Sequence, residues 1–244
     1  MYFSPTFASR MPVRTSNIHF KNPRLFFFML RFLQKRTPKF YYLQKTFDQK
    51  KFRLLDVGAG NHSASKTTRL FPQCEYYGID LNRHFNNDEN DFAAMKAFYE
   101  MDLTLLHFED IPNNHFDFIR MTHIIEHLRN GDEVIKGLLP KLKTHGYIYI
   151  EYPGVRSTRL PSMTGTLNFY DDPTHIRIYS VKELGVLLKG CNCTILSSGA
   201  RRNWIFLLGM PFRIGANLLR AKKPEGNMFW DLMGFAEFVF AQKN

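Results

Sequence analysis

The stretch LLDVGAGN, residues 54–61, decides the fold, because its apolar run reaches Asp56 and passes into a turn that contains Gly58 and Gly60. The next apolar run, CEYYGID, ends in Asp80. Where parallel strands end, glycines let the backbone approach a ligand, and an acid after the second strand binds ribose hydroxyls. Together the two features predict a site for an adenosine-containing cofactor at the carboxyl edge of a sheet.

On either side of this stretch, short apolar runs alternate with polar stretches of helix length, which is typical of β/α alternation around a mostly parallel sheet. Strands are predicted at residues 52–58, 74–80, 97–102, 116–123, 146–153, 193–199 and 236–242. Helices are predicted at residues 65–71, 92–97, 131–142 and 180–189. The region 204–234 is too apolar for a plain loop, so we expect one or two helices inserted before the last strand.

The net charge of +11 belongs to the N-terminal segment, because residues 1–53 hold twelve Lys and Arg residues against one acid, Asp48. Residues 1–50 are predicted to be a basic, partly apolar extension of a domain at 51–244. Its positive field attracts the phosphates of nucleic acid or anionic lipid headgroups, with a simple solvated arm as the alternative. The apolar run at 25–33 is too short to span a membrane and predicts an amphipathic helix, docked on the protein body or on a membrane surface.

The cysteine content bears on the compartment. Three cysteines are too few for a disulfide framework, which favours a reducing environment. The expected location is cytoplasmic, with peripheral attachment to a membrane as the alternative, and no transmembrane span is expected.

The stretch RMTHIIEHLRN, residues 120–130, contains H-x-x-E-H at His123, Glu126 and His127, a spacing also found in a class of zinc peptidases. A zinc peptidase needs this motif within one continuous helix. Here the first histidine ends an apolar run that reads as a strand, so the two histidines straddle a strand-to-helix turn. This context disfavours a peptidase and makes the three side chains candidates for lining a pocket.

A second polar group follows the fifth predicted strand, in the stretch FYDDPTHIRIYSVKEL. Asp172, His175 and Tyr179 lie there in a loop between two elements, a common place for functional side chains. The alternative is structural, with the aspartate capping a turn and the histidine bonded to the backbone.

Four segments in order, LLDVGAG, YYGIDLN, FDFIRMTHIIEHL and LKTHGYIYIEYP, resemble the motifs of class I S-adenosylmethionine-dependent methyltransferases. The resemblance covers about residues 51–189. It implies an α/β fold, a three-layer α/β/α Rossmann-like sandwich whose seven-stranded, mostly parallel sheet has the order 3-2-1-4-5-7-6 and an antiparallel last strand. It also implies S-adenosyl-L-methionine as the cofactor.

The same resemblance implies a role for each cofactor-binding residue. The turn from Asp56 through Gly58 to Gly60 holds the methionine end, Asp80 binds the ribose, Leu81 packs near the adenine, Asp102 approaches the adenine amine, and Met121 and Thr122 lie beside the sulfonium.

The predicted reaction is methylation of an oxygen on a small-molecule or glycan-like acceptor. An oxygen nucleophile must lose a proton, and the predicted base is His175 or His127, oriented by Glu126, with His123 as the fourth member of the catalytic set. Segments 160–170 and 204–230 are expected to form a lid. Contacts to an anionic acceptor are expected from Arg156, Arg159, Arg201 and Arg202.

Two alternatives remain open. Small-RNA 2′-O-methyltransferases resemble the pattern of Glu126, His127 and His175 and hold a divalent cation with it, which makes a metal-assisted RNA enzyme the first alternative. His123 stands where that family has Glu, so no metal is predicted. The second alternative is a non-catalytic membrane-associated or partner-binding protein that keeps the fold, against which the intact glycine turn and Asp80 argue.

Overall fold

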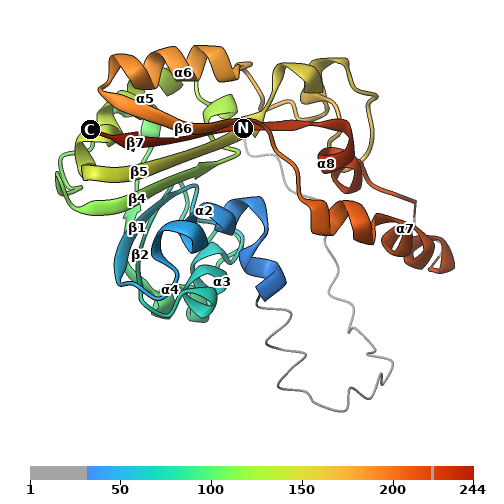
Figure 1. Ribbon diagram of the computed structural model, residues 1–244, viewed down its shortest axis with the longest axis horizontal. Coiled ribbons are helices and arrows are strands. Elements are labelled where there is room, and N and C mark those ends of the chain that lie inside the picture. Colours follow the sequence, from blue (N-terminus) through green and yellow to red (C-terminus); the bar gives the residue numbers. More distant parts are fainter. Residues whose placement is uncertain (1–31, 221–222) are drawn as a thin grey trace.

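The computed structural model describes residues 32–220 and 223–244 (Figure 1). Its centre is a seven-stranded sheet in the order β3-β2-β1-β4-β5-β7-β6. The strands are β1 (Phe52–Val57), β2 (Cys74–Asp80), β3 (Met95–Glu100), β4 (Phe116–Thr122), β5 (Leu142–Pro153), β6 (Cys193–Ala200) and β7 (Ala236–Lys243). β7 pairs antiparallel with both of its neighbours, and the other paired strands are parallel. The predicted strand order and the antiparallel last strand are confirmed.

Helices cover both faces of the sheet and give the predicted three layers (Figure 1). They are α2 (Pro38–Phe47), α3 (Ser63–Leu70), α4 (Glu89–Ala94), α5 (Gly131–Leu138), α6 (Val181–Gly190), α7 (Trp204–Leu219) and α8 (Trp230–Met233). Apolar side chains of α5 and α6 pack into one core, and those of α2 and α3 pack into the other. Because a strand alternates its side chains, Leu54 of β1 enters the second core and Leu55 enters the first. Burial on both faces explains the continuous apolar runs of the sequence.

Helix α2 is packed against the sheet. It begins with Pro38 at its first position, where a missing N–H leaves no bond unmade. Leu43 is fully buried, the ring of Phe47 stacks on Phe52 at 4.4 Å, and that of Tyr42 stacks on Phe240 at 4.2 Å. Part of the segment predicted as an extension therefore contributes to the core. The helix predicted at residues 25–33 lies almost entirely outside the described residues.

Several predicted element boundaries differ from those of the structure, most clearly the ends of two helices. The helix predicted at 92–97 ends at Ala94, and β3 begins at Met95. The helix predicted at 131–142 ends at Leu138, and after a 3₁₀ turn β5 begins at Leu142. The insertion at 204–234 contains α7 and α8. No helix within 32–220 or 223–244 is long and apolar enough to cross a membrane.

Candidate active site

A cavity of about 240 Å³ opens at the carboxyl edge of the sheet. Its lining consists of Gly58, Asp80, Leu81, Met101, Asp102, Leu103, Ile124, His127 and Leu128. These residues come from the ends of β2 and the turns after β1, β2, β3 and β4. They meet because parallel neighbouring strands end at the same edge. Five of the residues predicted from the sequence lie here, namely Gly58, Asp80, Leu81, Asp102 and His127.

The glycine turn leaves no room for side chains. Gly58 has a φ of +80°, a conformation that other residues rarely adopt, and a Cβ there would overlap Cδ1 of Ile124. At Gly60 a Cβ would lie 2.6 Å from Cδ1 of Phe85. The turn after β1 is thus closely packed under the turns after β2 and β4, and its backbone borders the cavity.

The two acids at the cavity are oriented by local hydrogen bonds. Oδ1 of Asp80 accepts from the N–H of Leu81 at 2.8 Å, and burial raises the pKa of this carboxyl. Oδ1 of Asp102 accepts from the N–H and the hydroxyl of Thr104 at 2.8 and 2.7 Å, which caps the 3₁₀ turn after β3. Both carboxylates are therefore held at the edge of the sheet, where they line the cavity.

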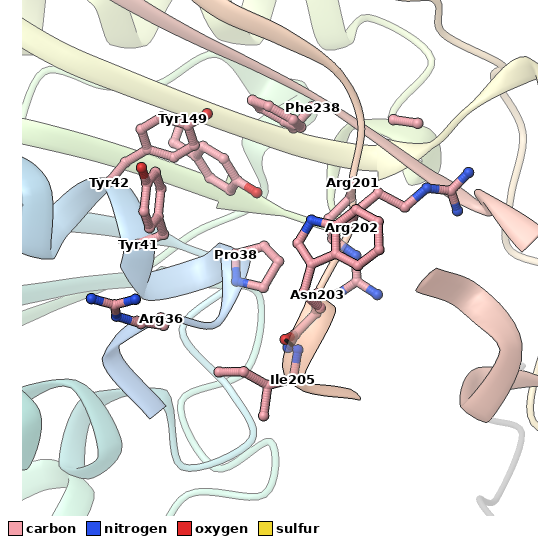
Figure 2. Close-up of a pocket in the computed structure, with 12 residues that line it drawn as sticks. Arg36, Pro38, Tyr41, Tyr42, Tyr149, Arg201, Arg202, Asn203, Ile205 and Phe238 are labelled. Carbon is pink, nitrogen blue, oxygen red and sulfur yellow. Dashed lines mark hydrogen bonds between the residues drawn. The ribbon is translucent and has the colours of Figure 1, made fainter. Parts of the chain in front are cut away.

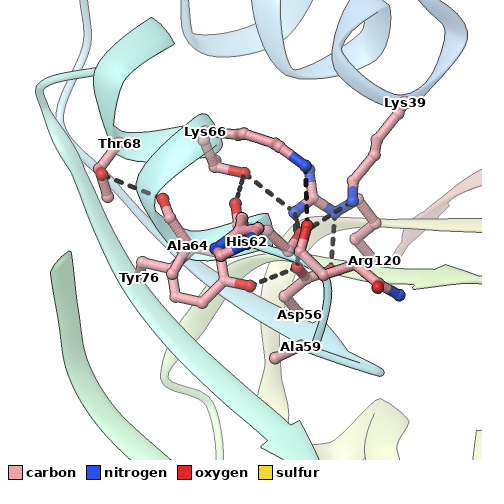
Figure 3. Close-up of polar contacts among 12 residues, drawn as sticks. Lys39, Asp56, Ala59, His62, Ala64, Lys66, Thr68, Tyr76 and Arg120 are labelled. Atoms are coloured by element: carbon pink, nitrogen blue, oxygen red, sulfur yellow. Dashed lines mark hydrogen bonds and ion pairs between the residues drawn. The ribbon is translucent and has the colours of Figure 1, made fainter. Parts of the chain in front are cut away.

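Asp56 is placed differently, because its carboxylate is buried among protein groups beneath the sheet edge (Figure 3). Nε and Nη2 of Arg120 donate to it at 2.7 and 2.6 Å, and the hydroxyls of Ser63 and Tyr76 also donate to it. Burial alone raises the pKa of a carboxyl, but the Arg120 guanidinium outweighs this effect and lowers the pKa of Asp56 to about 2. Asp56 thus joins β1, β2, β4 and α3 and does not line the cavity.

Lys39 of α2 reaches the same buried group and donates from Nζ to Oγ of Ser63 at 2.8 Å (Figure 3). Burial, together with the nearby Arg120 guanidinium, lowers the pKa of Lys39 to about 8. Nothing in the sequence pattern indicated this lysine. Met121 and Thr122, predicted beside the sulfonium, lie outside the cavity lining, and Met121 is fully buried in the core under α5 and α6.

His123 adopts a left-handed backbone conformation with φ of 56° and lies between two buried carboxylates. Nδ1 is 3.2 Å from Oε1 of Glu126, and Nε2 is 3.2 Å from Oε1 of Glu151. Burial lowers the pKa of a histidine, but these two acids outweigh it and raise the pKa of His123 to about 9. His123 is therefore a cation at neutral pH and is poorly suited to act as a base. The ring of Trp230 packs on it at 5.1 Å.

The ion-pair network continues from Glu151 to the inserted helices. Arg201 Nη1 lies 3.6 Å from Glu151 Oε1, and its Nη2 lies 3.1 Å from Asp231 Oδ2 in α8. Burial opposes ionisation of Glu151, but Arg201 and His123 lower the pKa of its carboxyl to about 2. Arg202 donates to the carbonyls of Asp231 and Leu232. Two of the four arginines predicted to meet an anionic acceptor thus tie α8 to the edge of the sheet.

Glu126, His127 and His175 come together, with one potential ligand atom of each within 4.8 Å of the others. The structure corrects the expectation of a strand-to-helix turn at this motif, because Glu126 and His127 lie in a 3₁₀ turn, η2 (Ile125–His127), and α5 begins only at Gly131. The carbonyl of Glu126 accepts from the N–H groups of Ile176 and Arg177 at 2.9 and 3.1 Å. These bonds fasten the loop after β5 onto the turn after β4.

Both histidines of this cluster are fixed through Nδ1. Nδ1 of His127 is 2.9 Å from Oγ1 and 3.2 Å from the carbonyl of Thr174, whose hydroxyl donates to Asp172 at 2.6 Å. Nδ1 of His175 is 2.7 Å from the carbonyl of Phe169. Nδ1 therefore carries the proton in both neutral rings, which leaves each Nε2 as a proton acceptor or a metal ligand.

A second cavity, of about 430 Å³, was not predicted from the sequence and lies between α2, the β5–β7–β6 side of the sheet and the start of α7 (Figure 2). Its lining contains three arginines, Arg36, Arg201 and Arg202, and no acid. It also contains five aromatic side chains from α2, β5, α7 and β7, namely Tyr41, Tyr42, Tyr149, Trp204 and Phe238. No local motif marks it, because its walls come from four distant segments. Arg201 lines this cavity and also pairs with Glu151, which in turn contacts His123. Ile124, the next residue in the chain, lines the first cavity.

A sheet with this strand order, a glycine turn after β1 and an acid at the end of β2 defines the protein as a class I S-adenosylmethionine-dependent methyltransferase. The chain belongs to the family described as methyltransferase domain, whose family model matches residues 22–198. The recognition made from the ordered motifs is confirmed, as are the enzyme class and S-adenosylmethionine as the cofactor.

Solved structures share this fold at low sequence identity. An S-adenosylmethionine-dependent methyltransferase from Archaeoglobus fulgidus is 18% identical, with a TM-score of 0.53 over 91% of this chain and 100% of that one. One from Mesorhizobium loti is 12% identical, with a TM-score of 0.59 over 84% and 97%. Phosphoethanolamine N-methyltransferase 2 from Haemonchus contortus is 18% identical, with a TM-score of 0.57 over 84% and 52%. No curated protein matches the chain significantly.

Proposed function

We propose that the chain binds S-adenosylmethionine in the cavity at the ends of β1 to β4 and methylates an oxygen of a small-molecule or glycan-like acceptor. One observation carries the proposal: the turn at Gly58, the oriented carboxylate of Asp80 and the ring of His127 line the same cavity. The turn offers backbone to the cofactor, the carboxylate can accept hydrogen bonds from the cofactor ribose, and the imidazole can act as the base.

The residues present fit the cofactor. Gly58 borders the cavity, and Asp80 is proposed to accept hydrogen bonds from the ribose hydroxyls with the carboxylate that Leu81 orients. Leu81, exposed at 68%, and Leu103 supply apolar walls for the adenine. When bound, S-adenosylmethionine supplies a methyl group already activated by a sulfonium, so the protein chiefly aligns the acceptor and excludes water.

The acceptor hydroxyl loses its proton to Nε2 of His127. The hydrogen bond from Nδ1 to Thr174, whose hydroxyl is in turn held by Asp172, fixes the ring in the tautomer that leaves Nε2 unprotonated. His175, whose ring centroid is 4.8 Å from that of His127, is the alternative base. Glu126 bonds His123 through Oε1, so its proposed contact with the base falls to Oε2, which has no hydrogen-bond partner among the described residues.

The cavity shown in Figure 2 is the proposed site for the rest of the acceptor. Arg36, Arg201 and Arg202 give it a positive lining, and the tyrosines provide flat apolar surfaces with hydroxyls at their edges. This composition favours an anionic acceptor with a ring system, in keeping with the glycan-like class. Arg156 and Arg159, in the exposed segment after β5, are proposed as further contacts.

Equilibrium binding of S-adenosylhomocysteine tests the cofactor site. Asp80→Ala should weaken binding at least a hundredfold, because the ribose hydroxyls lose their acceptor. Glu89→Ala, which removes an exposed carboxylate at the start of α4, should bind like the wild type. If the wild type does not bind, or Asp80→Ala binds equally well, the assignment of this cavity is wrong.

Transfer of a labelled methyl group to pools of hydroxylated small molecules and glycans then tests the acceptor class. With an acceptor identified, His127→Gln should lower kcat about 10²- to 10⁴-fold, as expected for loss of a general base. Methylation confined to nitrogen would contradict the assignment of an oxygen acceptor.

The cluster of Glu126, His127 and His175 supports a second candidate, a metal-assisted RNA 2′-O-methyltransferase. Its two imidazoles and one carboxylate suit a divalent cation, and both histidines donate Nδ1–H to a neighbour, as metal-ligating histidines usually do. In this case the Nε2 atoms of both histidines and the carboxylate of Glu126 would hold the cation, which would polarise the 2′-hydroxyl of the RNA ribose.

Methyl transfer to RNA that is lost with a chelator and restored by Mg²⁺ or Mn²⁺ would establish this candidate over the first. Transfer to a small acceptor that is insensitive to chelator would exclude it.

A further inference from the structure

Helix α7 stands out because none of its sixteen residues is buried. It projects at the margin of the molecule, beside α8 and away from the sheet (Figure 1). Its start is nonetheless rigidly held, because the N–H of Asn203 donates to Oδ1 of Asp231 at 2.8 Å and the side chain of Asn203 caps the helix. An exposed apolar helix that is firmly attached at one end is typical of a binding surface.

The most exposed apolar side chains lie on one side of α7. At about 100° per residue, positions 204, 208, 212 and 219 fall within an arc of about 80°. Their exposed fractions are 70% for Trp204, 77% for Leu208, 82% for Phe212 and 91% for Leu219. Asn217, on another side of the helix, contacts Sδ of Met228 and marks the side turned toward the protein. The four residues are termed here the α7 stripe. Trp204 also borders the second cavity, and Leu208, Phe212 and Leu219 face away from the core.

The basic residues on and after α7 indicate the kind of partner that the α7 stripe contacts. Residues 203–223 contain four basic residues, Arg213, Arg220, Lys222 and Lys223, and no acid. Arg213 and Arg220 lie about 120–140° around the helix from the centre of the stripe. Arg213 packs over the ring of Phe206 at 5.0 Å. An apolar side with basic residues beside it is the pattern of a helix that lies in a bilayer interface, with the cations at the level of anionic headgroups.

We infer that α7 docks the enzyme on an anionic lipid bilayer. The helix lies flat, since sixteen residues extend only about 24 Å and a span needs about 30 Å. The α7 stripe enters the boundary between headgroups and acyl chains, and Arg213 and Arg220 pair with lipid phosphates. The inference does not depend on which acceptor is methylated.

Flotation of the full chain with vesicles tests the inference, using phosphatidylcholine alone or mixed with phosphatidylglycerol. The wild type should float with the anionic vesicles and poorly with the neutral ones. Leu208→Ser/Phe212→Ser, which leaves the net charge unchanged, should weaken partitioning at least tenfold. The matched control Val186→Ser/Leu196→Ser removes exposed apolar groups from α6 and β6 and should float like the wild type.

Charge is tested in the same way. Arg213→Gln/Arg220→Gln should lose most of the preference for anionic vesicles, whereas Arg69→Gln/Lys189→Gln, an equal change of charge on α3 and α6, should keep it. Binding of S-adenosylhomocysteine shows that every variant is folded.

Three results would overturn the inference. The wild type fails to float with anionic vesicles, the two α7 variants float as well as their controls, or size-exclusion chromatography shows a dimer that Leu208→Ser/Phe212→Ser dissociates. The last result would mean that a second copy of the chain covers the stripe. None of these results would bear on the cofactor site.

Discussion

At the scale of single residues, Gly58 is the position at which one added methyl group should do most harm. Its φ of +80° and the overlap of a Cβ with Ile124 make alanine unfavourable for two independent reasons. Gly58→Ala should lower the free energy of unfolding by about 2–4 kcal/mol, measured by urea denaturation. It should also weaken binding of S-adenosylhomocysteine, because Ile124 lines the cofactor cavity and must move.

Gly185 is the matched control. It lies within α6, and a Cβ there would have no heavy atom within 4 Å. Gly185→Ala should raise the free energy of unfolding by about 0.5–1 kcal/mol through the loss of backbone entropy in the unfolded chain. Equal effects of the two substitutions would show that the turn at Gly58 is not closely packed.

Residue positions could be inferred from the sequence where the backbone pattern alone decides them. Gly58 follows β1 and Asp80 ends β2, and parallel strands bring their ends to one edge, so both line the cavity. Asp56 belongs to the same pattern, but the direction of its carboxylate depends on Arg120, which lies 64 residues further along the chain. His123 likewise lies between two acids on different elements. Contacts of this kind are set by tertiary packing, which no local spacing encodes.

At the scale of elements, the pair of Asp56 and Arg120 connects β1 to β4, and both side chains are almost fully buried. Removing one partner leaves the other as an uncompensated charge, so Arg120→Met should lower the free energy of unfolding by about 3–5 kcal/mol. Asp56→Asn/Arg120→Met should recover more than half of this loss, because Asn still accepts from Ser63 and Tyr76. Additive losses in the double variant would contradict this account.

The pH dependence of stability checks the same pair. The pKa of Asp56 falls from 3.8 to about 2 on folding, so its contribution is present above about pH 4 and is lost as the pH falls toward 2. On the order of 2 kcal/mol should be lost in this window. Urea denaturation at several pH values should show this loss in the wild type, and the double variant should lack the Asp56 share of it.

The type of each element was easier to predict than its limits. The helix predicted at 92–97 was placed too late, because the capping box of Asp88 and Asp91 starts α4 at Glu89 and residues 95–97 belong to β3. The sequence predicted that a helix starts near Glu126 and His127, since the H-x-x-E-H motif has a helical spacing. The hydrogen bonds that the carbonyl of Glu126 accepts from Ile176 and Arg177 hold it as a 3₁₀ turn.

At the scale of the whole molecule, the alternation of strands and helices and the ordered motifs were enough to predict the sheet and its layers. The seven apolar runs all became strands of one sheet. The second cavity and the α7 stripe could not be predicted in the same way, because they arise from how appended segments pack around the sheet. The packing of residues 38–47 could not be predicted either, because the sequence pattern assigned them to an N-terminal extension and the structure packs them on the sheet as α2.

Leu43 of α2 gives a test of that question. It is fully buried among side chains of the sheet, so Leu43→Ala should lower the free energy of unfolding by about 2–5 kcal/mol in a single transition. Saturation with S-adenosylhomocysteine at a hundred times its Kd should add about 2.7 kcal/mol to the wild type and to the variant alike. Leu43 does not line the cofactor cavity, so the two effects should add to within about 0.5 kcal/mol. The exposed control Lys45→Ala should leave both quantities unchanged. If α2 were an independent appendage, Leu43→Ala would leave the free energy of the main unfolding transition unchanged. Residues 38–47 would then not belong to the core.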